Sequence, residues 1–120
     1  MMRRRRTNPD YLNGVPELLI LKLLSRRPMY GYELVQSIAA LSGDRLEFGE
    51  GCIYPLLHRL ELEGALTSQR EDVGGRSRVV YCVSTIGQQR LDNDTSRWRD
   101  IVEAVQWVLR GGAHGHAKLA

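Results

Sequence analysis

The stretch GEGCIYPLLHRLELEGAL (residues 49–66) decides how the rest of the chain is interpreted. Its apolar residues recur at the spacing of one face of an amphipathic helix: Ile53, Leu56, Leu57 and Leu60. Pro55 interrupts this pattern, because a proline inside a helix removes a hydrogen bond and clashes with the preceding turn. If the helix begins near residues 50–52, Pro55 lies in or just after its first turn, where few bonds are lost. The pattern therefore predicts a helix whose start Pro55 marks and whose end Gly64 caps.

Two helices are predicted before this stretch. The first runs over Val15–Ser25, with Pro16 in its first turn, where a missing N–H is tolerated. The second opens at Tyr30 and runs to about Leu41. Its core-facing stripe repeats at i, i+4 and i+7 through Leu34, Ile38 and Leu41.

After position 64 the spacing of the apolar residues changes from that of a helix to that of β-strands. Strand candidates at residues 66–72 and 77–84 flank the turn-forming Val73-Gly74-Gly75-Arg76, which predicts a β-hairpin. Ser84 or Thr85 then caps a last helix, and Thr85 with Gln88 fits a capping box.

Three short helices followed by a hairpin are typical of a winged helix-turn-helix, whose third helix enters the major groove of DNA. We therefore expect a mainly α fold with a small β hairpin and a long C-terminal dimerisation helix. The expected organisation is a basic flexible arm (1–11), the winged helix-turn-helix (12–84), the dimerisation helix (85–110) and a flexible tail (111–120).

Composition excludes several classes of protein. The chain has 120 residues, of which 42% are apolar, and no apolar run approaches the roughly 20 residues of a membrane span. No apolar signal core follows the arginines at the N-terminus, so we expect a cytoplasmic protein without a membrane partner. Its two cysteines lack a CxxC spacing, and neither a P-loop nor a nucleophile elbow is present. We expect no enzyme, no cofactor and no metal site.

The net charge of +3 resides in the first ten residues, which hold four arginines and one aspartate, so that 4 − 1 = +3. The remaining 110 residues hold 13 basic and 13 acidic groups and are neutral as a set. An argument for nucleic-acid binding therefore depends on where charge is placed.

The residues expected at DNA come from three segments. The side of the third helix opposite its apolar face can reach phosphates or base edges, and the hairpin tip can lie along the backbone. The arm resembles the flexible arms that enter minor grooves, although basic termini bind any polyanion weakly. With Tyr30 at the start of the second helix, the predicted set is Arg3, Arg4, Arg5, Arg6, Tyr30, Gly51, Tyr54, Pro55, His58, Arg59, Arg76 and Arg78.

The last helix carries apolar residues at heptad-like positions, which predicts a self-complementary dimer contact. The predicted interface or effector residues are Leu91, Trp98, Ile101, Val102, Val105 and Val108. Two Trp98 side chains brought together by a twofold axis could bracket a small planar apolar effector. Packing of Trp98 within the dimer interface is the simpler interpretation.

Three segments together resemble the PadR-type transcriptional regulators: LLILKLLSRRPMYGYEL (18–34), GCIYPLLHRLELEGAL (51–66) and GGRSRVVYCVSTIGQQRL (74–91). The resemblance covers roughly residues 12–110 and looks like the compact branch of the family, which has one C-terminal helix. It implies a dimeric repressor that binds operator DNA, with much of the dimer contact formed by the last helix.

The expected function is therefore a sequence-specific DNA-binding regulator, a ligand-responsive repressor acting as a homodimer on double-stranded operator DNA. The alternative is a winged-helix adaptor that binds proteins and not DNA, which the neutral charge of the body favours.

Overall fold

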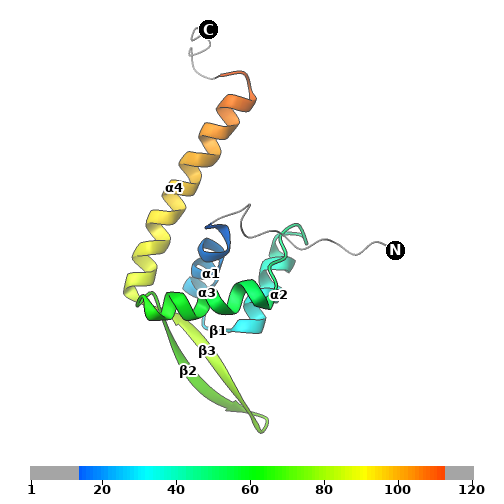
Figure 1. The fold of residues 1–120 in the computed structure, drawn as a ribbon, viewed down its shortest axis with the longest axis vertical. Helices are drawn as coiled ribbons and strands as arrows, with labels where there is room; N and C mark the ends of the chain where they lie inside the picture. The colour runs from blue at the N-terminus through cyan, green and yellow to red at the C-terminus, as the bar shows by residue number, and fades with distance from the viewer. Residues whose placement is uncertain (1–13, 113–120) are drawn as a thin grey trace, which may run out of the picture.

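A computed structural model describes residues 14–112, which form four α-helices and one three-stranded antiparallel sheet (Figure 1). No helix among these residues is both long and apolar enough to cross a membrane. The elements follow one another as α1 (Val15–Arg26), β1 (Met29–Tyr30), α2 (Gly31–Leu41), α3 (Glu50–Leu62), β2 (Leu66–Val73), β3 (Arg76–Val83) and α4 (Thr85–Leu109).

The core lies between α1, α2, α3 and the root of the sheet. The helices supply most of its fully buried side chains: Ile20, Leu21, Leu34, Ile53, Leu57 and Leu60. Of these, Leu34, Ile53, Leu57 and Leu60 lie on the predicted apolar stripes. Phe48, in the loop before α3, is also buried, and no periodic pattern in the sequence marks it. Each side chain of this size stabilises the fold by about 1.5–3 kcal/mol relative to an exposed position.

Two predicted core positions differ in the structure. Leu41 is 67% exposed, because α2 ends at this residue and its last inward-facing side chain is Ile38. Leu56 is only half-buried and packs against the edge of the core.

α3 begins one residue after Gly49, whose carbonyl accepts the N–H groups of Cys52 and Ile53, both at 3.0 Å. Pro55 is the sixth residue of the helix and so lies just after its first turn. Since it has no N–H, only the carbonyl of Gly51 loses its partner four residues ahead. At the other end Gly64 adopts φ +82°, and Ala65 N–H donates to Leu60 O at 2.9 Å. This is a Schellman cap, and it confirms that Gly64 ends the helix.

The predicted hairpin is formed by β2 and β3, which pair from Leu66↔Val83 to Val73↔Arg76. Gly74 and Gly75 connect them with φ values of +57° and +80°, as a type I′ turn requires. We call β2, this turn and β3 the wing. The sheet has a third strand that was not predicted, β1, which pairs with β3 through Met29↔Tyr81 and Tyr30↔Val80.

α4 begins where the wing returns to the body (Figure 1). Ser84 is its N-cap: its Oγ accepts the Gly87 N–H at 3.0 Å and donates to the Gly64 carbonyl at 2.6 Å. The predicted capping box of Thr85 and Gln88 is wrong, because Thr85 is already the first helical residue and the third is Gly87. The first half of α4 packs beside α1, and its second half extends beyond the rest of the molecule (Figure 1).

Candidate nucleic-acid interface

The predicted DNA-facing side of α3 is open to solvent. Gly51, Pro55 and His58 are exposed, and Tyr54 is half-buried between α3 and α2. Burial, together with the nearby charge of Glu50, raises the pKa of Tyr54, so its hydroxyl stays protonated and can donate a hydrogen bond. The arm residues Arg3, Arg4, Arg5 and Arg6 lie outside the described residues, and their contact with DNA stays a prediction.

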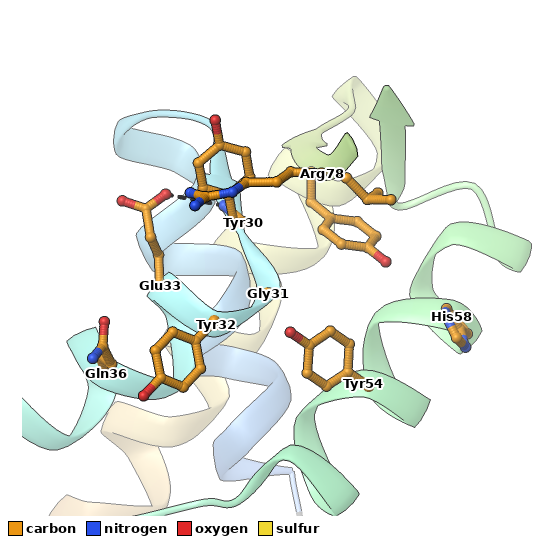
Figure 2. A pocket seen from close by; sticks show the side chains of 10 residues that line it. Tyr30, Gly31, Tyr32, Glu33, Gln36, Tyr54, His58 and Arg78 are labelled. Atoms are coloured by element: carbon orange, nitrogen blue, oxygen red, sulfur yellow. Dashed lines mark hydrogen bonds between the residues drawn. The ribbon is translucent and has the colours of Figure 1, made fainter. Parts of the chain in front are cut away.

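A cavity of about 570 Å³ opens between α2, α3 and β3 (Figure 2). It brings together four residues that were predicted separately, namely Tyr30, Tyr54, His58 and Arg78. The remaining lining residues are Gly31, Tyr32, Glu33, Gln36, Val79 and Tyr81. Aromatic rings dominate its surface, and a guanidinium, an imidazole, an amide and several hydroxyls supply groups that can donate to an anion.

Tyr32 and Gln36 were missed by the sequence reasoning. Both are exposed on α2, one turn apart, and both line the cavity. Their spacing of i and i+4 on the polar side of α2 was the available signal. Only the fold shows that this side of α2 faces the same cavity as Tyr54 and His58.

Gly31 explains how Tyr54 comes to lie across the start of α2 (Figure 2). A Cβ atom at Gly31 would stand 2.5 Å from Cε1 of Tyr54, well inside van der Waals contact. Any larger residue at this position would therefore push the Tyr54 ring away. Gly31 thus fixes how closely α2 and α3 approach at the mouth of the cavity.

Tyr30 joins α2 to the wing. Its hydroxyl donates to Glu71 Oε1 at 3.1 Å, and the Arg78 guanidinium lies 5.2 Å from the centre of its ring (Figure 2). The hydrogen bond to Glu71 is the main reason that the pKa of Tyr30 is raised. Its backbone N–H donates to Glu33 at 3.0 Å, and this bond, assisted by Arg27, lowers the pKa of Glu33.

The two wing arginines differ in position. Arg76 is the first residue of β3, next to the turn, and is exposed. Arg78 lies two residues nearer the body, on the rim of the cavity. Arg76 at the tip and Arg78 at the cavity therefore lie on the same face of β3.

Arg59 is not brought into the cavity. Its guanidinium donates to Glu17 of α1 at 2.8 Å and to Glu63, the C-cap of α3, at 3.2 Å, and Arg90 of α4 reaches Glu63 at 2.7 Å. The hydrogen bond to Glu17 is the largest contribution to a raised pKa of Arg59, while Arg90 is the main cause of a lowered pKa of Glu63. These ion pairs tie the C-terminal half of α3 to α1 and α4. A contact between Arg59 and DNA stays a prediction.

The apolar side of α4 divides into two parts. Leu91 is only 4% exposed and belongs to the core of the monomer, so we correct its assignment to a dimer interface. Beyond it the apolar residues become exposed: Trp98 is 42% exposed and Val108 is 75% exposed. We call Trp98, Ile101, Val105 and Val108 the α4 stripe; Val102 lies beside it and is half-buried.

A second cavity, of about 250 Å³, lies between the start of α1 and the middle of α4. Trp98 and Ile101 line it on the α4 side, together with Asp94 and Arg97, and α1 contributes Glu17 and Leu18. Burial is the main reason that the pKa of Asp94 is raised, and the charge of Glu17 adds to it. This hollow lies within one chain, whereas the effector position predicted from the sequence lies between the Trp98 side chains of two copies, and that position stays a prediction.

Comparison with known proteins gives a consistent result. The model of the "Transcriptional regulator PadR-like family" matches residues 20–93. The transcriptional regulator Rv3488 of Mycobacterium tuberculosis is 32% identical over 105 residues, which is 88% of this chain and 92% of that protein. The transcriptional regulator YqjI of Escherichia coli is also 32% identical, over 84% of this chain but only 47% of its own length.

Solved structures agree with this result. The crystal structure of a PadR family transcriptional regulator from Eggerthella lenta has a TM-score of 0.73 and 30% identity, covering 83% of this chain and 86% of that one. A transcriptional regulator from Clostridium thermocellum has a TM-score of 0.76 at 23% identity, covering 81% and 95%, which shows the shared fold. The four relatives described here are all named as transcriptional regulators.

Proposed function

Because the chain belongs to the transcriptional regulator PadR-like family, we propose that it is a ligand-responsive repressor that binds operator DNA as a homodimer. DNA-binding regulation of transcription follows from the family. We propose three further properties: repression of transcription, dimerisation and a response to a ligand. The observation that supports the proposed contact with DNA is that side chains of α2, α3 and the wing line one open cavity.

In the proposed complex, the N-terminal half of α3 enters the major groove, and Tyr54 and His58 face base edges or phosphates. The dipole of α3 favours this end, because its free N–H groups attract anions. The acidic residues at its C-terminal end are engaged within the protein: Ser68 donates to Glu61 at 2.6 Å, and Arg59 and Arg90 bind Glu63, the C-cap. Arg76 and Arg78 then reach the backbone beside the groove, with Tyr32 and Gln36 as further candidates.

The proposed dimer uses the α4 stripe. Large apolar side chains along one exposed helix face are most simply covered by the same face of a second copy. A twofold axis would place two α3 helices at successive major grooves, roughly 34–36 Å apart. Small changes at the dimer contact would therefore change the spacing that the DNA has to match.

The proposed effector is a small planar apolar molecule that binds beside Trp98. The hollow between α1 and α4 offers the indole and Ile101 as an apolar wall. A ligand in this hollow would separate α1 from α4 and alter the angle between the two winged domains. Ligand binding would then lower affinity for the operator.

The proposal is tested by the salt dependence of DNA binding. Fluorescence anisotropy is measured on DNA upstream of the protein's own gene and on duplexes selected from a random pool. The double variant Arg76→Ala with Arg78→Ala should bind more weakly and with a flatter dependence on salt, by roughly 0.9 in slope for each phosphate that the variant no longer neutralises. The same removal of charge at Arg99→Ala with Arg110→Ala, both exposed on the far part of the molecule, should leave the slope unchanged.

An unchanged slope in the wing variant would remove the wing from the contact surface. If the native protein shows no salt-sensitive binding to either kind of DNA, the repressor proposal fails. That outcome would favour the protein-binding adaptor, a function that fits the equal numbers of acidic and basic residues beyond residue 10.

A further inference from the structure

We infer that Tyr30 is a positioning residue that acts on DNA through Arg78, by fixing the wing to the start of α2. This inference rests on the proposed function and assigns one role within it. Tyr30 was predicted to touch DNA directly. The contacts of its ring and hydroxyl indicate instead that both are engaged inside the protein.

The register of the sheet brings three side chains to one face. Tyr30 of β1 pairs with Val80 of β3, and Arg78 lies two residues before Val80 on the same strand. Side chains two residues apart on a strand share a face, and such diagonal neighbours are within reach of aromatic and long side chains. Glu71 of β2 is the direct partner of Arg78. Each of the three strands thus contributes one member: Tyr30, Arg78 and Glu71.

The chemistry of these groups restricts the Arg78 side chain. A guanidinium is planar and is attracted to the face of an aromatic ring, so the Tyr30 ring provides a flat support for it. Glu71 holds the ring in place through the Tyr30 hydroxyl at 3.1 Å, and its negative charge lies beside the strand that carries Arg78. A guanidinium supported on its face still has its N–H edge free, and that edge binds phosphate.

Tyr30, whose ring supports Arg78, is itself held in place by hydrogen bonds at the start of α2. Tyr30 ends β1 and precedes the first residue of α2, where its backbone N–H donates to Glu33. Arg27 holds the other oxygen of Glu33 at 3.1 Å. Because α2 packs directly on α3, Arg78 is held at a fixed position relative to α3, the helix proposed to enter the major groove, and not only by its own strand.

A double-mutant cycle separates this role from direct contact. The full chain is measured by anisotropy on a duplex selected from a random pool, over a range of salt concentrations. Tyr30→Leu and Arg78→Ala should each weaken binding by about tenfold, within the range typical of residues in contact, and each should flatten the salt slope by roughly 0.9 per subunit. Tyr30→Leu should cause no further loss of DNA affinity when Arg78 is already alanine. Additive losses would overturn the inference.

Tyr32→Leu provides the matched control, because Tyr32 also lines the cavity but lies on α2, outside the sheet. Its effect should add to that of Arg78→Ala. Tyr30→Phe keeps the ring, so it tests the inference even if the leucine variant fails to fold. It should retain most of the slope, and its small effect should disappear in the Arg78→Ala background.

A loss from Tyr30→Phe that persists without Arg78 would mean that the hydroxyl itself touches DNA, and this also overturns the inference. Failure of the proposed function looks different, because the native chain would then select no DNA from the pool.

Discussion

Gly87, in the first turn of α4, rests against the backbone that links α3 to β2. A Cβ atom there would collide with the carbonyl oxygen of Ala65 and would come within 2.7 Å of Cγ2 of Val83. That carbonyl already accepts the Ser84 N–H at 3.0 Å, so it cannot move away freely. The contact requires glycine for space, even though glycine weakens a helix.

Gly87→Ala should therefore lower the free energy of unfolding, by about 1–3 kcal/mol for an overpacked site, measured by urea denaturation. Gly51→Ala is the matched control. It also replaces a glycine in the first turn of a helix, but nothing lies within 4 Å of its Cβ position. It should be neutral or slightly stabilising. Equal effects at the two sites would show that the Ala65 contact is not tight.

Single residues could be predicted from the sequence where the reason is local. Pro55 and Gly64 mark the two ends of α3 through their own backbone preferences, and both predictions agree with the structure. Gly31 and Gly87 carry no such local signal, because each makes room for a group from another element, namely Tyr54 and the Ala65 carbonyl.

Among the elements, α2 depends on a carboxylate at its first turn. Glu33 accepts the Tyr30 N–H and binds Arg27, and these interactions lower its pKa below the ordinary value of 4.5. The ionised form is thus favoured by the folded state. Its contribution to stability is present above about pH 4.5 and is lost as the pH falls through the lower pKa of the folded state.

Glu33→Gln keeps an oxygen that can accept the Tyr30 N–H but has no charge to titrate. Between about pH 6 and about pH 3, the native protein should lose more unfolding free energy than this variant does. Urea denaturation at the two pH values measures the difference. Glu103→Gln, at an exposed position of α4, controls for the loss of a carboxylate. The same pH dependence in the native protein and in Glu33→Gln would contradict the assignment.

Elements with a repeating pattern were predictable, and the others were not. The apolar stripes of α2 and α3 and the glycine turn of the wing lie within short segments, so they could be predicted from the sequence. β1 is two residues long and is a strand only because β3, about fifty residues away, pairs with it. The α4 cap was ambiguous because Ser84 and Thr85 are both good N-caps, and only the path of the wing decides for Ser84.

At the scale of the whole molecule, the α4 stripe is a row of apolar side chains that stay between 42% and 75% exposed. If it is the dimer contact, Trp98→Asp should place a charge in an apolar interface and give a monomer in sedimentation experiments. Ser96→Asp adds the same charge on another side of α4, at an exposed position, and should leave a dimer. A stable Trp98→Asp dimer would refute the assignment of the interface.

The way in which the site residues come together could not be predicted from the sequence. Periodicity placed Tyr54 and His58 on one side of α3, and turn chemistry placed Arg76 and Arg78 near the wing tip. That Tyr30, Tyr32 and Arg78 share a cavity with Tyr54 and His58 follows from how α2, α3 and β3 pack. The same packing directs Arg59 to Glu17, a residue 42 positions away in the chain.

The outer part of the wing has few means of staying ordered by itself. β1 supports β3 only at Val80 and Tyr81, and the side chains of residues 70–73 and 76–78 are all exposed. A two-stranded ribbon without a core is only marginally stable in water, and such segments open without unfolding of the whole domain. The tip beyond Glu71 and Arg78, which contact Tyr30, is therefore the part of the wing that we expect to open most readily. Conformational entropy lost there on contact with a backbone opposes association, so affinity depends on the stiffness of the ribbon as well as on its charges.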